Sequence, residues 1–150
     1  MWWQALVLLP VLLLGLAGQA RADEADEAYY RRASACTAVL KREVVALRDR
    51  FLRGDAAVRP EIQRLTEQSF TFVGIAYKRG LRNPQADRLL DEAEAAQQRQ
   101  PATTLRQLFN DCQAEGAKLF SGSNAIERAL VRNRAKARVE QLLTPPARTG

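Results

Sequence analysis

The 150-residue chain contains no histidine, one methionine and two cysteines. Without histidine it lacks the commonest zinc ligand and the usual general base near neutral pH, which excludes a Ser-His or Cys-His nucleophile. It also lacks a glycine-rich phosphate loop, an S-x-x-K arrangement and the C-x-x-C-H motif that attaches haem. We therefore expect a non-enzymatic protein with no metal ion and no cofactor.

Long apolar runs are also missing, except for one at the amino terminus. Residues 5–14 are apolar apart from one proline, no Lys or Arg precedes them, and an Ala-Arg-Ala triplet ends at Ala22. This pattern predicts a signal peptide over residues 1–22, cleavage between Ala22 and Asp23, and a periplasmic or secreted mature protein. The alternative is an uncleaved membrane anchor, but a helix over residues 2–17 would cover about 24 Å of a hydrocarbon core about 30 Å thick.

Cys36 and Cys112 are the only cysteines. An even count in an exported protein indicates a disulfide, because the compartment is oxidising. Each cysteine lies on the apolar stripe of its own predicted helix, so we expect both sulfurs to face one core. Gly116 lies one turn after Cys112, where the missing side chain would let the helix that bears Cys36 approach. A bridge closing a loop of about 77 residues would stabilise the fold by about 4.5 kcal/mol in the chain-entropy model.

Helical periodicity covers most of the chain after the leader. Apolar residues recur at steps of three and four between prolines and glycines, which predicts five helices. We expect them over residues 24–53, 60–80, 83–100, 101–120 and 124–143. Asn124 and Glu127 form a predicted capping box at the start of the last one. Residues 70–77 have the composition of a strand, but no second strand is available for pairing, so we predict a buried helix.

Short connections and the predicted disulfide indicate how these helices pack. We predict an all-α fold, a compact antiparallel up-down bundle of four to five helices stapled by one disulfide and preceded by the signal peptide. The bundle forms a single domain over residues 23–143, and residues 144–150 form a disordered tail. In this arrangement the first and fourth helices are antiparallel neighbours.

Positive charge is concentrated near the carboxyl terminus. The net charge is +6, and residues 121–150 contain six basic and two acidic side chains. Arg128, Arg132 and Lys136 lie at successive i+4 positions, which fits contact with an anionic lipid surface but also an ordinary solvated helix face. No aromatic residue is interleaved among them for base stacking, and the predicted export disfavours nucleic acid, so we expect no nucleic-acid partner.

Two resemblances bear on function. Gly74, Tyr77 and Gly80 have the G-x-x-Y-x-x-G spacing of a Sel1-like repeat, but this pattern occurs once and a solenoid needs several stacked repeats. The predicted architecture also resembles that of small periplasmic acid-stress chaperones, which are short exported helical domains with two cysteines in one disulfide. That resemblance implies chaperone or partner-binding activity.

These observations favour binding over catalysis. The leading hypothesis is an exported helical protein that engages another envelope protein or an unfolded client. A second hypothesis is a small-molecule or lipid carrier with an apolar pocket between helices, and a third is an anionic membrane-surface binder that uses the basic last helix. The pocket would be lined by side chains that otherwise fill the core: Phe70, Phe72, Ile75, Tyr77, Leu108 and Phe109.

Overall fold

The protein is all-helical over the part of the chain that the structure describes. The computed structural model describes the backbone of residues 9–145 and the side chains of residues 22–145. Five α-helices and one 3-10 helix follow one another: α1 (Leu9–Leu52), η1 (Ala56–Val58), α2 (Arg59–Lys78), α3 (Asn83–Gln98), α4 (Ala102–Gly122) and α5 (Ala125–Leu143). Residues 70–77 lie within α2, so the helix predicted there is confirmed.

The predicted signal peptide and the predicted tail fall mostly outside the described residues. Residues 1–8 and 146–150 are not described, and residues 9–21 are described only as helical backbone. α1 begins at Leu9 and continues without a break through the predicted cleavage position. Among the described residues, no helix has a stretch that is long and apolar enough to cross a membrane.

Glycines and a capping box mark the helix ends. Gly54 and Gly80 have φ angles of 106° and 115°, the left-handed conformation that favours glycine just after a helix. The Asn124 side chain accepts a hydrogen bond from the Glu127 amide at 2.9 Å, and the Asn124 amide donates to the Glu127 carboxylate at 3.2 Å. The predicted capping box is therefore confirmed. The predicted end of the fourth helix was wrong, because α4 continues through Gly122.

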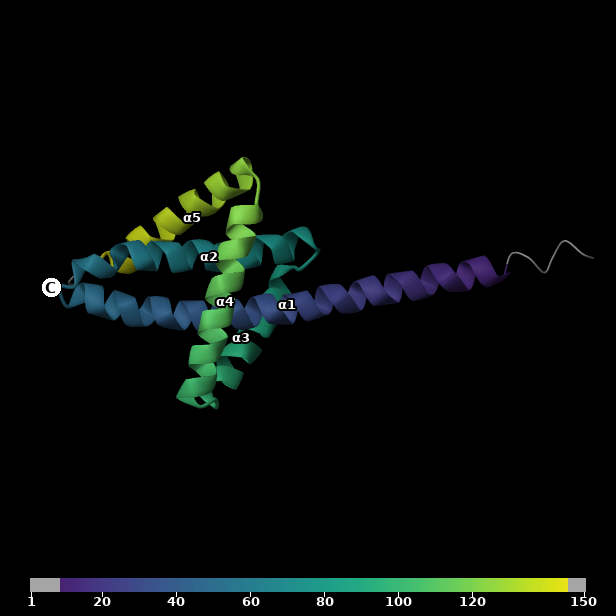
Figure 1. Cartoon of the computed structure of the whole chain (residues 1–150), viewed down its shortest axis with the longest axis horizontal. Coiled ribbons are helices and arrows are strands. Elements are labelled where there is room, and N and C mark those ends of the chain that lie inside the picture. Colours follow the sequence, from purple (N-terminus) through teal and green to yellow (C-terminus); the bar gives the residue numbers. More distant parts are fainter. Residues whose placement is uncertain (1–8, 146–150) are drawn as a thin grey trace, which may run out of the picture.

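α1 and α2 form an antiparallel hairpin, and the other helices pack around it (Figure 1). α3 packs on α1, α5 packs on α2, and α4 lies across both members of the hairpin at a steep angle. The antiparallel arrangement predicted for the whole bundle, with the first and fourth helices as antiparallel neighbours, is therefore wrong for α4. Within one turn, α4 meets α1 at Cys112 and α2 at Gly116, so both members of the hairpin contact it where it crosses them (Figure 1).

The core lies where the hairpin is covered by the remaining helices. Its largest fully buried side chains are Cys36 and Leu40 of α1, Ile62, Leu65 and Phe72 of α2, Cys112 of α4 and Val139 of α5. α3 contributes Leu89, which is also buried. One continuous hydrophobic cluster therefore includes side chains from each of the five α-helices.

A disulfide joins Cys36 of α1 to Cys112 of α4, as predicted. The two cysteines are 76 positions apart in the sequence, their Cα atoms are 5.2 Å apart, and both side chains are fully buried. The bond fixes α4 to the hairpin at the point where the two helices cross.

Gly116 permits a close helix crossing, but the neighbouring helix is not the one expected. A Cβ atom built on Gly116 would lie 2.9 Å from Cβ of Gln68 and 3.1 Å from Cε2 of Phe72, and both of these residues belong to α2. The sequence led us to expect α1 at this place. The structure corrects the expectation because α4 passes from α1 to α2 between Cys112 and Gly116.

Replacing both cysteines with alanine is expected to lower the free energy of unfolding by about 3–5 kcal/mol, because the denatured chain regains the entropy that the closed loop removes. Chemical denaturation followed by circular dichroism measures this change. A reductant should lower the denaturation midpoint of the wild-type protein and leave that of the double variant unchanged. Equal midpoints for the two proteins without reductant would contradict the prediction.

Gly116→Ala is expected to cost about 1–3 kcal/mol of stability, because the new methyl group would press on the Gln68 Cβ at the crossing of α4 and α2. Gly122→Ala is the matched control, since Gly122 belongs to the same helix and has nothing within 4 Å of an added Cβ. The control should be neutral or slightly stabilising. Equal urea midpoints for the two variants would show that α4 and α2 are not in close contact at Gly116.

Candidate functional site

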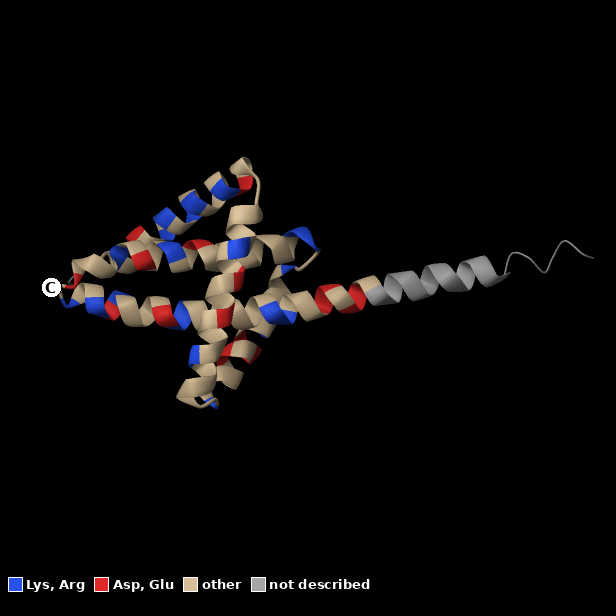
Figure 2. Ribbon diagram, in the orientation of Figure 1, with Lys and Arg blue, Asp and Glu red and all other residues tan. Residues whose placement is uncertain are grey.

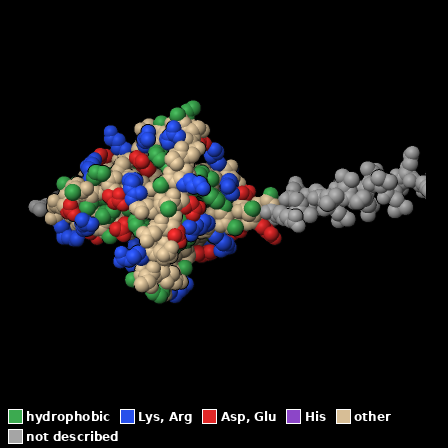
Figure 3. Space-filling model, viewed as in Figure 1, with side chains coloured by type: hydrophobic (Ala, Val, Ile, Leu, Met, Phe, Trp, Pro, Cys, Tyr) green, Lys and Arg blue, Asp and Glu red, His purple; other side chains and the backbone are tan. Residues whose placement is uncertain are grey.

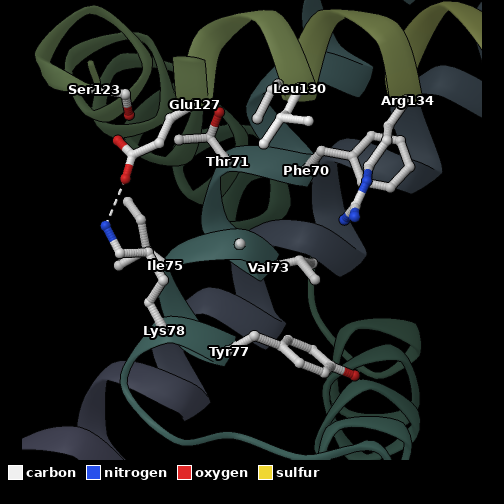
Figure 4. Close-up of a pocket in the computed structure, with 12 residues that line it drawn as sticks. Phe70, Thr71, Val73, Ile75, Tyr77, Lys78, Ser123, Glu127, Leu130 and Arg134 are labelled. Carbon is white, nitrogen blue, oxygen red and sulfur yellow. Dashed lines mark hydrogen bonds and ion pairs between the residues drawn. The ribbon is translucent and has the colours of Figure 1, made fainter. Parts of the chain in front are cut away.

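An apolar groove of about 490 Å³ lies between the carboxyl-terminal half of α2 and the amino-terminal half of α5. It is neither an enclosed cavity nor a flat surface, and Figure 4 shows side chains from the two helices lining it. Those from α2 are Phe70, Thr71, Val73, Gly74, Ile75, Tyr77 and Lys78. Ser123, Glu127, Leu130, Val131 and Arg134 complete the lining from the start of α5 and the residues before it.

The groove is open because α5 packs on the hairpin mainly through its second half. The buried side chains of α5 are Ala135, Val139 and Leu143, all in that half. In the first half, Ile126 is 75% exposed and Leu130 is 54% exposed, and they are the two most exposed large hydrophobic side chains among the described residues. In Figure 1 the two helices are close at the carboxyl-terminal end of α5 and diverge toward its amino-terminal end.

Gly74 lies at the open middle of the groove. It is an exposed residue within α2, and a Cβ atom built on it would have no other atom within 4 Å. A glycine inside a helix costs about 0.5–1 kcal/mol relative to alanine. No backbone strain explains its presence, because only Gly54 and Gly80 have positive φ angles in the described chain. Gly74 therefore leaves the groove deeper at this point than any other residue type would.

The three hydroxyl groups of the lining are already engaged within the protein. Thr71 donates to the Glu67 carbonyl at 2.8 Å, Ser123 donates to the Leu119 carbonyl at 2.9 Å, and Tyr77 donates to the Asn83 side chain at 2.5 Å. Their donor groups are therefore not available to a ligand without rearrangement. The exposed inner surface of the groove is dominated by apolar side chains.

The two ends of the groove differ in charge. At one end the Lys78 ammonium and the Glu127 carboxylate form an ion pair at 2.5 Å, which Figure 4 shows as a dashed line. Hydrogen bonds from Lys78 and from the Asn124 backbone lower the pKa of Glu127, which favours its charged carboxylate form. At the other end lie Phe70 and Arg134. Among the described residues, Arg134 forms no ion pair with a carboxylate.

The structure brings together half of the apolar residues proposed from the sequence. Phe70, Ile75 and Tyr77 line the groove. Phe72 does not, because its side chain is fully buried in the core. Leu108 and Phe109 are also elsewhere, since they lie on α4 and pack against the core. The single pocket proposed for these six residues is therefore corrected to a groove that α4 does not line.

Sequence reasoning missed the contribution of α5 to the groove. Val131 extends the stripe of Ala135, Val139 and Leu143 by one turn, whereas Leu130 lies off this stripe and Ile126 precedes Leu130 by one turn. The available signal was that Ile126 and Leu130 fall outside this stripe although both are large and apolar. Such residues on a predicted helix indicate a surface that its own fold leaves uncovered.

The three basic residues proposed for an anionic surface have different environments. Arg128 donates to the carbonyls of Ser121 and Ser123 and so caps the end of α4. Arg132 lies over the Phe120 ring, with its Cζ atom 5.3 Å from the ring centroid. Lys136 and Arg132 also line a separate hollow of about 390 Å³ between α2 and α5, together with the acidic residues Glu67 and Glu140. Only Arg132 and Lys136 therefore share one surface.

The chemical groups in and around the groove suit binding. Both cysteines belong to the disulfide, and Glu127, the carboxylate in the lining, is paired with Lys78. Among the described residues, no group of three or more acidic or cysteine side chains is placed to hold a metal ion. The groove offers apolar surface, one ion pair and one guanidinium group.

Comparisons with known proteins identify no relative of this chain. No family model matches the chain, and neither a curated protein nor a solved structure is similar to it.

Proposed function

We propose that this protein is an exported, non-enzymatic binding protein that accommodates an apolar segment of another protein in the groove between α2 and α5. The observation that carries the proposal is the uncovered apolar surface formed by the groove and the adjoining Ile126 and Leu130. Small proteins tend to bury such residues, and contiguous exposed apolar surface commonly marks an interaction site.

The disulfide and the leader support export. A fully buried disulfide fits a protein that folds in an oxidising compartment. The apolar leader of residues 1–22 supports export, with cleavage between Ala22 and Asp23 and a periplasmic or secreted mature form. The partner would then be another envelope protein or an unfolded client present in the same compartment.

A lipid or small-molecule carrier is the second candidate. The groove volume of about 490 Å³ lies within the range of about 300–1,000 Å³ for small-ligand sites. A carrier, however, usually covers most of its ligand, and this groove is open on one side. The openness favours a protein segment, because the rest of the partner can remain outside.

The third candidate is contact with an anionic membrane surface. Arg132 and Lys136 support it because they line the same hollow, whereas Arg128 supports it less because its guanidinium group is engaged with backbone carbonyls. This surface is separate from the lining of the apolar groove, so the two proposals can be tested independently.

Filling the groove tests the proposal. A photo-crosslinking amino acid at Leu130 is expected to give an adduct of defined mass in the intact envelope, and Gly74→Leu in the same protein should reduce that adduct at least about tenfold. The leucine side chain would project into the open space above Gly74. Leucine also has the higher helix propensity, so the variant should unfold no earlier than the wild-type protein in a thermal scan.

Two controls accompany this experiment. Gly122→Leu adds the same side chain at an open helical glycine outside the groove and should leave the adduct unchanged. The crosslinker at Ala95, an exposed residue of α3, should give no matching adduct. Recovery of monomer alone at position 130, or an adduct that persists in Gly74→Leu, would count against the groove as the binding site.

A further inference from the structure

We infer that the segment bound by the groove is an amphipathic α-helix with an acidic polar side. This inference rests on the proposed function and adds the conformation and charge of the partner segment. It is carried by the shape of the groove, by the charge of α5 and by the position of Arg134.

The walls of the groove favour a helical guest over an extended one. α2 and α5 are regular helices, so their backbone amides and carbonyls in the groove are bonded within each helix. An extended segment that binds by strand addition requires a strand edge, and the described chain contains no strand. A helix satisfies its backbone internally and can pack its side chains between two diverging helices.

The groove determines how much of the guest is covered. Its α2 wall extends from Phe70 to Lys78, a length of about 13 Å at 1.5 Å per residue. A guest helix would therefore contact the groove over two to three turns, with apolar residues at i, i+3, i+4 and i+7. Gly74, near the middle of this wall, gives space for the largest of them.

The charge of the surrounding surface favours an acidic guest. α5 contains five basic and two acidic residues, and Figure 2 shows its ribbon marked mainly by blue segments. Both acidic residues are already paired, Glu127 with Lys78 and Glu140 with Arg59. The remaining positive charge therefore has few carboxylate partners among the described residues, which makes acidic side chains complementary to this surface.

Arg134 sets where the acidic side chain should lie. It follows Leu130 by one helical turn and lines the groove at the end opposite the Lys78–Glu127 pair. An acidic residue beside the last apolar residue of the guest would reach the guanidinium group while the apolar residue fills the groove. Arginine is well suited to this contact because its planar group can bind a carboxylate with two parallel hydrogen bonds.

A second copy of this chain is a poor guest. The exposed apolar strip of one molecule, Ile126 and Leu130, lies on the same basic helix α5 that borders the groove. Docking this strip into the groove of another copy would bring the two basic helices together, and like charges in an interface disfavour association. The chemistry of the surface therefore indicates a different, acidic partner.

The inference is tested with two fluorescent, end-blocked peptides of about 14 residues that share a leucine seam at i, i+3, i+4 and i+7. One carries Glu and the other carries Lys on the opposite side. The mature disulfide-bonded protein is expected to bind the Glu peptide at least about tenfold more tightly than the Lys peptide, with an affinity that falls as salt increases.

Arg134→Glu should lower the affinity for the Glu peptide by about three- to tenfold and raise the affinity for the Lys peptide. Lys136→Glu, the control on the same helix outside the groove, should change either affinity less than Arg134→Glu does, because its charge acts on the peptide only at long range.

Each other outcome has a definite meaning. If both peptides bind equally and Gly74→Leu abolishes binding, the groove is a binding site but has no preference for an acidic segment. Binding that persists in Gly74→Leu overturns both the inference and the proposed function. If neither peptide binds, the inference of a helical partner segment is wrong. The photo-crosslinking at Leu130 then remains the test of the groove as a binding site. The last outcome is that phosphatidylglycerol vesicles displace the Glu peptide from the wild-type protein and fail to bind Gly74→Leu. This result would show that the groove binds a lipid, and it would contradict the inference of a peptide segment.

Discussion

The crossing of α4 over the α1–α2 hairpin is the constraint on which the rest of the structure depends. The Cys36–Cys112 disulfide fixes α4 to α1, and the missing side chain at Gly116 lets α4 lie close to Gln68 of α2 one turn later. Because α4 passes over the hairpin, its carboxyl-terminal end lies beyond α2 (Figure 1). The short connection at Ser123 and Asn124 requires α5 to begin there.

The open groove follows from where α5 begins and where it is anchored. Ala135, Val139 and Leu143 hold its second half against the core, while its first half starts at a distance from α2. The long side chains of Lys78 and Glu127 span this distance with an ion pair. On the face drawn in Figure 3, charged side chains of both signs are interspersed with small hydrophobic groups, as on an ordinary soluble surface. The groove differs because its apolar side chains are contiguous and its central residue is a glycine.

The sequence predicts the helices and the disulfide well because both depend on local or countable features. Periodicity, prolines, glycines and the Asn124–Glu127 capping box locate the helices, and two cysteines allow only one pairing within the chain. Helix crossing angles depend on contacts between distant residues, so an apolar stripe shows that a face is buried without showing which helix covers it. For that reason Phe72 was assigned to a pocket although it fills the core, and the role of Leu130 was missed.

The most direct test asks whether the groove is open in solution. Methyl NMR spectra of the disulfide-bonded protein, recorded with a soluble paramagnetic relaxation agent, compare side chains of the groove with side chains of the core. An open groove predicts strong broadening of the Leu130 methyl groups, clear broadening of those of Ile75 and Val131, and none for Val139, which is buried. Protection of Leu130 equal to that of Val139 would show that α5 closes onto α2, and it would contradict the central claim.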